Sequence, residues 1–219
     1  MFLYEAGTND LKYTFVHTLN RKGLPDTLVL DPSIRYDLRV ATVPSIAKNN
    51  IPIIPHTHNT IQIAAGQGQL KITSVKSPES TQIQTRITQE SNAKTLHVQQ
   101  LGEIQKYLIG SYQLEILTLP RTYKEVKIEQ SKLTSIDIPA AGQFVYQAPK
   151  SIIGQVFYER NIGQWEWVCD LPSSQSAGTI RLQPGTFKVV YRQKDQRSST
   201  YTKEKKFTIS SLKITNLTL

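Results

Sequence analysis

The sequence predicts an all-β protein made of tandem small β-sandwiches, and three observations lead to that fold class. The tetrapeptide Ala64-Ala65-Gly66-Gln67 recurs letter for letter at residues 140–143. Residues 36–44 are echoed by residues 112–120 at the same spacing, and a third copy begins at Phe187. No long stretch carries apolar residues at the i, i+3, i+4, i+7 spacing of an amphipathic helix. Repetition at one period indicates a row of similar modules rather than one large domain.

Each repeat is expected to open with alternating strands, followed by a short strand that leads into a tight turn. The opening strands are expected at residues 11–19, 82–88, 154–158 and 165–168, with a hairpin turn at Asn161-Ile162-Gly163. The short strands are expected at residues 27–30, 103–107 and 179–182. The turns that follow carry proline or glycine, as in Pro184-Gly185, and these residues preset turn dihedrals.

Each repeat is then expected to end in strand, turn, strand, turn and strand. Tyr112, Leu114 and Ile116 alternate with polar residues, which is the period-2 pattern of a half-buried strand. We expect three pairs at equivalent inward positions: Leu38 and Val40, Leu114 and Ile116, and Val189 and Tyr191. The later strands are expected at residues 51–53 and 60–63, 126–128 and 133–138, and 207–209 and 214–219. Short strands at regular spacing with turn signals between them predict β-sandwiches.

The repeats predict three domains, at residues 1–67, 68–143 and 144–219. The first domain is the shortest and opens abruptly in alternating sequence, so we expect it to be truncated at its N-terminus. Met1-Phe2-Leu3-Tyr4-Glu5 lacks the basic stretch and the apolar h-region of a signal peptide. The hypothesis is that more protein precedes Met1 in the natural polypeptide.

Composition and charge narrow the classes of partner. The chain is 38% hydrophobic and 20% charged, and it holds no run of 18 apolar residues, so we expect no membrane span. The net charge of +9 invites a nucleic-acid interpretation, but the basic residues are mostly spread along the chain and no aromatic-basic RNA-binding motif occurs. Lys203, Glu204 and Lys205 are typical of an edge strand or a solvent face. We therefore expect no nucleic-acid partner. An anionic polysaccharide stays open as a possible partner class.

Two segments look like metal sites when they are taken alone. Asp31-Pro32-Ser33 follows an apolar strand, as in the metal-ion-dependent adhesion motif, but Arg35 stands where a second serine is required. The repeat aligns Asp31-Pro32 with Gln183-Pro184, so we interpret the segment as a turn. His56 and His58 would share one face of a strand and could bind zinc, but a closed zinc site needs four ligands. Their repeat counterparts cannot bind zinc, and we expect solvated turn histidines.

The tryptophans and the single cysteine lie together at residues 165–169. Strict alternation would place Trp165, Trp167 and Cys169 on one face, and we expect that face to be core, because large rings supply much of the buried area of a thin sandwich. No carboxylate pair, phosphate loop or nucleophile-and-base set follows from the sequence. We therefore expect no catalytic residues, no cofactor and no metal, and predict that the chain is not an enzyme.

The segment Leu182-Gln183-Pro184-Gly185-Thr186-Phe187-Lys188-Val189 resembles the Pro-Gly-x-Tyr/Phe-x-Val/Leu core of PEGA, or carboxypeptidase-regulatory-like, β-sandwich repeats. The sequence overall is also similar to the region downstream of the von Willebrand A domain in exported proteins of the Bacteroidetes type. The first two repeats depart from the Pro-Gly pattern at Pro32-Ser33 and Ile109-Gly110. The resemblance implies small Greek-key sandwiches, of the immunoglobulin-like (Ig-like) or transthyretin-like kind. It also implies an extracytoplasmic protein, in the periplasm or on the cell surface, with no catalytic residue to carry over.

Two functions stay open. The first is a non-catalytic tandem β-sandwich region that acts as a spacer or protein-interaction module of a larger exported or cell-surface protein. Its partner would be an upstream domain of the same polypeptide or another surface protein. The alternative is a carbohydrate or surface-polymer binding module, in which Tyr158, Trp165 and Trp167 would stack on the ligand. Buried tryptophans favour the spacer and exposed ones favour the binding module.

Overall fold

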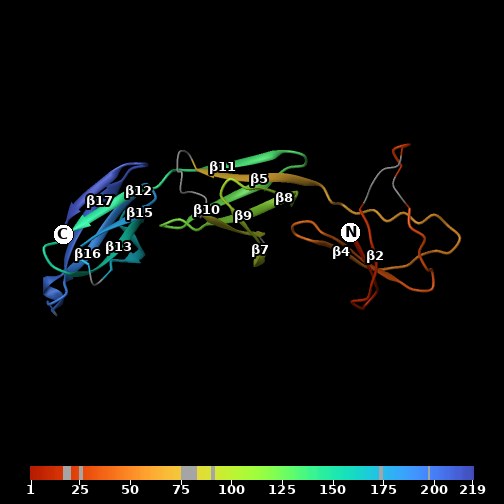
Figure 1. The fold of residues 1–219 in the computed structure, drawn as a ribbon, viewed down its shortest axis with the longest axis horizontal. Coiled ribbons are helices and arrows are strands. Elements are labelled where there is room, and N and C mark those ends of the chain that lie inside the picture. The colour runs from red at the N-terminus through yellow and green to blue at the C-terminus, as the bar shows by residue number, and fades with distance from the viewer. Residues whose placement is uncertain (17–20, 25–26, 75–82, 90–91, 173–174, 197) are drawn as a thin grey trace. The chain divides into compact units, whose positions relative to one another are not determined.

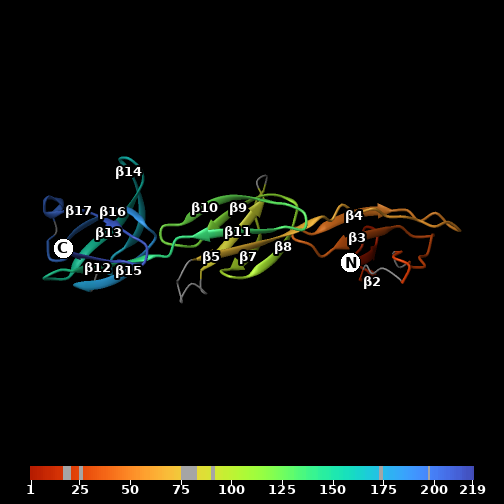
Figure 2. The same ribbon diagram turned by 90° about the horizontal axis from the view of Figure 1, so that it is seen from above.

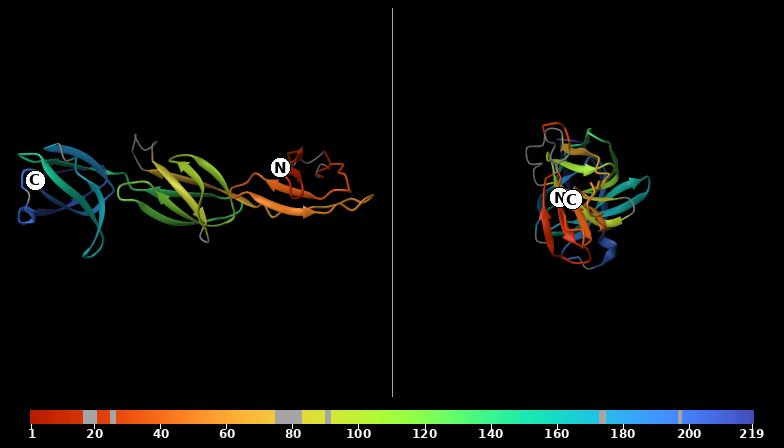
Figure 3. Two further views of the ribbon diagram at one scale, coloured as in Figure 1. Left: turned by 90° about the horizontal axis from the view of Figure 1, so that it is seen from below. Right: turned by 90° about the vertical axis from the view of Figure 1, so that its right-hand side faces the viewer.

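A computed structural model describes residues 1–16, 21–24, 27–74, 83–89, 92–172, 175–196 and 198–219, except for the side chains of residues 92–93. Strands and the turns between them make up this part of the chain in every view (Figure 3), with a single short 3₁₀ helix and no α-helix among the described residues. The predicted all-β fold class is confirmed. None of the described residues forms a helix long and apolar enough to cross a membrane.

The N-terminal repeat forms one antiparallel sheet. Its strands are β1 (Phe2–Glu5), β2 (Leu11–Thr14), β3 (Tyr36–Val40) and β4 (Ile46–Ile51). They lie in the order β2-β1-β3-β4. The alternation of β3 buries Tyr36 and Leu38 on one face, where they join Leu3 and Ile51 in a small core. Residues 17–19, which were expected to continue β2, lie outside the described residues.

The middle repeat forms a four-stranded and a three-stranded sheet. Its strands are β5 (Gln67–Ser74), β6 (Gln84–Gln89), β7 (Asn92–Gln100), β8 (Ile104–Leu108), β9 (Gly110–Ile116), β10 (Thr122–Ile128) and β11 (Leu133–Ile138). The sheet orders are β10-β9-β6-β7 and β11-β5-β8. Residue 82 of the expected opening strand lies outside the described residues.

The C-terminal repeat shows the same pair of sheets (Figures 1 and 2). Its elements are β12 (Gly142–Gln147), β13 (Ile152–Asn161), β14 (Gln164–Asp170), β15 (Ala177–Leu182), β16 (Gly185–Gln193), the 3₁₀ helix η2 (Ser199–Tyr201), β17 (Lys203–Ile209) and β18 (Ile214–Thr218). The orders β14-β13-β16-β17 and β15-β12-β18 match the middle repeat strand for strand when its sheets are read as β7-β6-β9-β10 and β8-β5-β11. The expected hairpin turn at residues 161–163 joins β13 to β14.

Aromatic side chains from both sheets fill the core of the C-terminal repeat. Phe144 of β12 stacks on Phe207 of β17 with ring centroids 4.2 Å apart, and Phe187 of β16 lies 5.6 Å from Phe207. Val156 of β13 and Leu182 of β15 are fully buried in the same cluster. The two sheets therefore form a sandwich that is held together by the hydrophobic effect.

The predicted inward pairs are buried with one exception. Leu114 and Ile116 of β9 are 1% and 0% exposed, and Val189 and Tyr191 of β16 are 0% and 6% exposed. In β3, Leu38 is buried at 4%, but Val40 is only half-buried. Period-2 alternation thus identified the inward face correctly.

The two copies of Ala-Ala-Gly-Gln do not occupy equivalent positions in the two repeats, because the structural alignment is shifted by two residues from the sequence alignment. Gln143 N donates to Lys213 O at 2.9 Å, and the matching bond in the middle repeat is from Gln69 N to Lys132 O at 2.8 Å. A Cβ on Gly142 would lie 2.3 Å from Ser210 O, and one on Gly68 would lie 2.1 Å from Glu129 O. Gly68-Gln69, rather than Gly66-Gln67, is therefore the counterpart of Gly142-Gln143. A shift of two residues keeps every side chain on its face, so alternation alone does not reveal it.

Two strands expected in the N-terminal repeat do not form. Residues 27–30 and 60–63 were expected to be strands, but both lie outside regular structure. Their counterparts, β15 and β18, flank β12 on either side. Among the described residues, no strand pairs with residues 27–30 or 60–63 in the way that β12 pairs with β15 and β18.

By its internal contacts the chain divides into two compact units. One comprises residues 1–70, 105–110 and 127–134, and the other comprises residues 71–104, 111–126 and 135–219. The predicted three-domain division at residues 67 and 143 stays a prediction.

Candidate functional site: the outer face of the C-terminal sheet

The two tryptophans lie on the outer face of the sheet β14-β13-β16-β17, not in the core. Trp167 is 55% exposed and Trp165 is half-buried. The expectation that both are core is wrong because the pairing of β13 with β14 contains a bulge. Val156 pairs with Cys169 and the next residue, Phe157, pairs with Trp167, so Val168 is an extra residue. A bulge reverses the alternation beyond it, which sends Val168 inward and both tryptophans outward.

Aromatic and basic side chains form one row across this face. The registers place Trp167 opposite Phe157, Phe157 opposite Lys188, and Lys188 opposite Lys206. Trp165 lies beneath both ammonium groups: Lys188 Nζ is 4.8 Å and Lys206 Nζ is 5.3 Å from its ring centroid. Lys188 Nζ also lies 5.9 Å from the Phe157 ring. Two cations therefore share the electron-rich face of one indole.

A carboxylate and an amide border the exposed indole of Trp167. Trp167 Nε1 donates to Asp170 Oδ1 at 3.2 Å, and Gln155 Nε2 donates to the same oxygen at 2.9 Å. The bond to Asp170 therefore engages the indole only at the edge that carries its N–H. Trp167 is 55% exposed, so part of its ring surface is open to a ligand, with polar groups beside it.

The two lysines of the row differ in their ionic partners. Lys188 Nζ lies 3.2 Å from Glu204 Oε2, in a pair formed across β16 and β17. Lys206 makes no ion pair with a described residue, and its described contact is with the Trp165 ring. Of these two lysines, Lys206 is therefore the one that is available to an anion.

Tyr158 does not join this face. It is half-buried against the core, where its ring lies 5.3 Å from Phe187. A Cβ on Gly185 would lie only 2.6 Å from Tyr158 Cε2, so the tyrosine ring fills the space that the glycine leaves. Of the three predicted ligand contacts, the structure brings together Trp165 and Trp167 and places Tyr158 on the opposite side of the sheet.

The remaining sequence candidates lie in structural positions. Cys169 packs partly buried against the core, and burial raises the pKa of its thiol, with a smaller effect from Asp170. His56 adopts a φ of 55° in an exposed turn, as expected from its repeat counterparts Ser131 and Leu212, whose φ angles are 57° and 60°. The described residues contain no group of three or more His, Cys, Asp or Glu side chains that could hold a metal ion.

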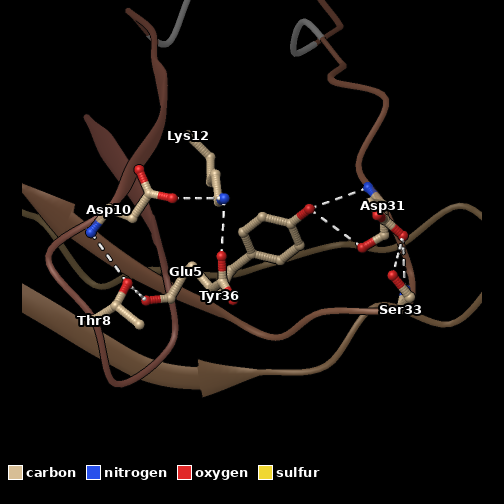
Figure 4. Close-up of polar contacts among 7 residues, drawn as sticks. All are labelled: Glu5, Thr8, Asp10, Lys12, Asp31, Ser33 and Tyr36. Carbon is tan, nitrogen blue, oxygen red and sulfur yellow. Dashed lines mark hydrogen bonds and ion pairs between the residues drawn. The ribbon is translucent and has the colours of Figure 1, made fainter.

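The Asp31 segment is a turn, as predicted. Asp31 Oδ1 accepts hydrogen bonds from Ser33 N at 2.9 Å and from Ser33 Oγ at 2.6 Å (Figure 4). The bond from the Ser33 hydroxyl, followed by that from its backbone, lowers the pKa of the Asp31 carboxyl. The Tyr36 hydroxyl accepts from Asp31 N at 3.1 Å and lies 3.2 Å from Asp31 O. These contacts fix the start of the turn against the buried Tyr36 ring.

A second polar group in the same view closes the hairpin of β1 and β2. Lys12 Nζ lies 2.8 Å from Glu5 Oε2 and 2.7 Å from Asp10 Oδ2 (Figure 4). Hydrogen bonds to Asp10 and then to Glu5 raise the pKa of the Lys12 ammonium. Thr8 accepts from Asp10 N at 3.0 Å and completes the turn. All these groups are bonded to one another, which is the arrangement of a structural turn.

Sequence reasoning missed the residues that surround the tryptophans. Lys188 alternates with the buried Phe187 and Val189, so its outward direction could have been inferred from the sequence. Its place opposite Lys206 depends on the register between β16 and β17, which no local pattern shows.

Comparison with known proteins gives similarity at low identity only. No protein-family model and no curated protein matches the chain, so the resemblance to PEGA repeats stays a prediction. Among solved structures it is similar to the TIE protein of Bacillus anthracis, with 11% identity and a TM-score of 0.30 over 91% of this chain and 39% of that one. It is similar to the minor pilin of Streptococcus agalactiae, with 12% identity and a TM-score of 0.34 over 69% and 94%. A streptococcal ancillary pilin gives 11% identity and a TM-score of 0.29 over 84% and 75%. None of these similarities assigns a role to a residue of this chain.

Proposed function

We propose that this chain is a non-catalytic tandem β-sandwich region of a larger exported or cell-surface protein, in which it acts as a spacer or protein-contact module. The observation that carries the proposal is the repetition of one architecture. The strands β5–β11 and β12–β18 have the same sheet orders and the same backbone bonds at their first strands. Repeating a unit adds length and surface rather than a reaction centre. The extracytoplasmic location rests on the resemblance of residues 182–189.

Removal of the middle repeat tests the spacer function. Deletion of residues 68–141 joins Gln67 to Gly142, and Gly142 is the structural counterpart of the deleted Gly68. We expect the flanking repeats to fold as before and the hydrodynamic radius to fall. Tryptophan fluorescence reports on the C-terminal repeat alone, since Trp165 and Trp167 both lie in β14 and are the two tryptophans of the chain. Loss of cooperative unfolding in that signal would show that the repeats are not independent modules.

Location is tested separately. In the cells that encode the protein, protease treatment of intact cells should remove the chain if it lies on the surface. A protein that is degraded only after the cells are lysed contradicts the surface location, whatever the outcome of the repeat deletion.

A second candidate function, binding of a carbohydrate or surface polymer, is favoured by the exposure of Trp167. An exposed indole beside a carboxylate and an amide can stack on a sugar ring while polar atoms accept and donate to its hydroxyls. The ammonium of Lys206 adds attraction for an acidic group on the same polymer. The ligand class that fits best is therefore a polysaccharide that carries carboxylate or phosphate groups.

A panel of neutral and acidic polysaccharides tests this candidate. Trp167→Ala should abolish saturable binding, and Lys206→Gln should weaken the binding of acidic polymers while leaving neutral ones unchanged. Ile162→Ala is the matched control, because Ile162 is an exposed apolar residue in the turn of the same hairpin, at 100% exposure. Equal binding by Trp167→Ala and Ile162→Ala excludes the aromatic face as the site.

A further inference from the structure

The positive charge of the chain is concentrated in its C-terminal repeat. Residues 142–219 hold 11 of the 26 Lys and Arg residues and 5 of the 17 Asp and Glu residues, so +6 of the net +9 belongs to this repeat. Two of these lysines, Lys188 and Lys206, lie on the outer face of the sheet together with the tryptophans. A charge excess beside exposed aromatic rings attracts a polyanion that also has apolar surface.

Trp165 holds the two lysines in one place. Lys188 Nζ and Lys206 Nζ lie 4.8 Å and 5.3 Å from the centroid of its ring. Glu204 pairs with Lys188 at 3.2 Å, so the two ammonium groups and this carboxylate together carry one positive charge. One positive charge matches a singly charged group such as a carboxylate. The lysines on Trp165 therefore form an anion subsite.

The surroundings of Trp167 have the opposite charge. The carboxylate of Asp170, an exposed residue, accepts bonds from Trp167 Nε1 at 3.2 Å and from Gln155 Nε2 at 2.9 Å. An acidic group on a ligand would be repelled by this carboxylate. A neutral sugar can instead stack on the indole and donate its hydroxyls to Asp170. Trp167 therefore forms a subsite for a neutral sugar.

The two subsites are separate, and an aromatic ring lies between them. Trp165 and Trp167 are two residues apart on β14, and Trp167 and Lys206 stand three strand spacings apart in the row. Strand geometry places the anion subsite between about 7 Å and about 14 Å from Trp167. A sugar stacked on Trp167 is too short to place its own acidic group there. Phe157 lies opposite both Trp167 and Lys188 and offers an apolar surface to a second sugar ring.

We propose that this face selects a polysaccharide in which neutral sugars alternate with uronic acids. Trp167 and Asp170 bind a neutral sugar, and Lys188 and Lys206 bind the carboxylate of a uronic acid on the same chain. Trp165 is a positioning residue that acts through the two lysines. This specificity presupposes the polysaccharide-binding function proposed for the same face.

Three oligosaccharides of equal length test the alternation. Hyaluronan alternates a uronic acid with a neutral sugar, polygalacturonate carries an acid on every sugar, and hyaluronan with its carboxyl groups reduced to alcohols carries none. Isothermal titration calorimetry of the full chain should show that the hyaluronan octasaccharide binds at least about tenfold more tightly than either of the others. Free glucuronate should not bind measurably, because one sugar cannot occupy both subsites.

Substitutions separate the roles of the two tryptophans. Trp165→Leu should weaken hyaluronan binding about twofold to fivefold by releasing the lysines, and it should leave reduced hyaluronan unchanged. Trp165→Phe keeps a ring beneath the lysines and should retain most of the affinity. Trp167→Ala should weaken the binding of both forms. Lys206→Gln should weaken hyaluronan binding, whereas Lys213→Gln removes the same charge from an exposed turn and should not.

Four results would overturn the proposal, and they are distinguishable. If the parent chain binds none of these polysaccharides, the polysaccharide function fails and the specificity fails with it. If polygalacturonate binds as tightly as hyaluronan, that function holds and the alternation is wrong. If Trp165→Leu weakens both forms of hyaluronan equally, Trp165 does not act through the lysines. If a mannan with phosphodiester links binds more tightly than hyaluronan, the acidic group is not a uronic acid.

Discussion

Truncation of Phe144 to alanine tests the core of the C-terminal repeat. Phe144 is fully buried and stacks on Phe207 at 4.2 Å. Removing a buried phenylalanine costs ~3–5 kcal/mol, a range that includes the loss of an aromatic pair worth ~0.5–1.5 kcal/mol. At ~0.05–0.15 kcal/mol per residue, the 78 residues 142–219 have a free energy of unfolding of ~4–12 kcal/mol. The substitution therefore removes a large part of the stability of this repeat.

Urea unfolding followed by tryptophan fluorescence measures the effect. Both tryptophans lie in β14, so the signal reports on the repeat that contains Phe144. With a slope of ~1–3 kcal/mol per M of urea, the midpoint should fall by at least ~1 M. Ile162→Ala, at a fully exposed turn position, should change the free energy of unfolding by less than ~0.5 kcal/mol. If Phe144→Ala unfolds at the same urea concentration as this control, Phe144 does not pack between the two sheets.

Three further outcomes are expected. Leu114→Ala should cost ~2–5 kcal/mol by circular dichroism in urea, because Leu114 is 1% exposed, and an unchanged midpoint would contradict its inward position. Cys169 should react more slowly with a thiol reagent in the folded chain than in urea, because burial raises its thiol pKa, and equal rates would contradict that burial. Hydrogen bonds from Arg86 and then Arg121 lower the pKa of the Glu115 carboxyl in the folded chain. Its contribution to the free energy of unfolding is therefore complete above the unfolded pKa of about 4.3, and it is lost as the pH falls through the lower folded pKa. The midpoint should therefore drop more between pH 7 and pH 3 for the parent than for Glu115→Gln, and equal drops would show that the carboxylate contributes nothing.

Much of the fold could be predicted because the signals are local. The alternation in residues 112–116 identified the buried face of β9, and the turn at residues 161–163 identified the hairpin of β13 and β14. Alignment of the repeats also predicted the turn at Asp31, whose carboxylate accepts two bonds from Ser33 within that turn. Each inference depended on neighbours in the sequence and on elementary strand geometry.

The candidate site could not be predicted in the same way. The extra residue Val168 in the pairing of β13 with β14 reverses the faces of Trp165 and Trp167, and nothing in the local pattern marks it. The place of Lys206 above Trp165 depends on the register of two separate strand pairs. Tyr158, which was expected to contact a ligand together with the tryptophans, packs against the core instead.

The sequence by itself determined that this protein is all-β and repetitive, because side-chain alternation and turn residues act over a few neighbouring positions. Only the tertiary structure decided that the two tryptophans lie on the outer face of their sheet and which of the expected segments form strands. Residues 27–30 carry the pattern of a strand, yet a strand forms only when another main chain accepts and donates its hydrogen bonds. In the C-terminal repeat β12 supplies that main chain, and in the N-terminal repeat no described segment does.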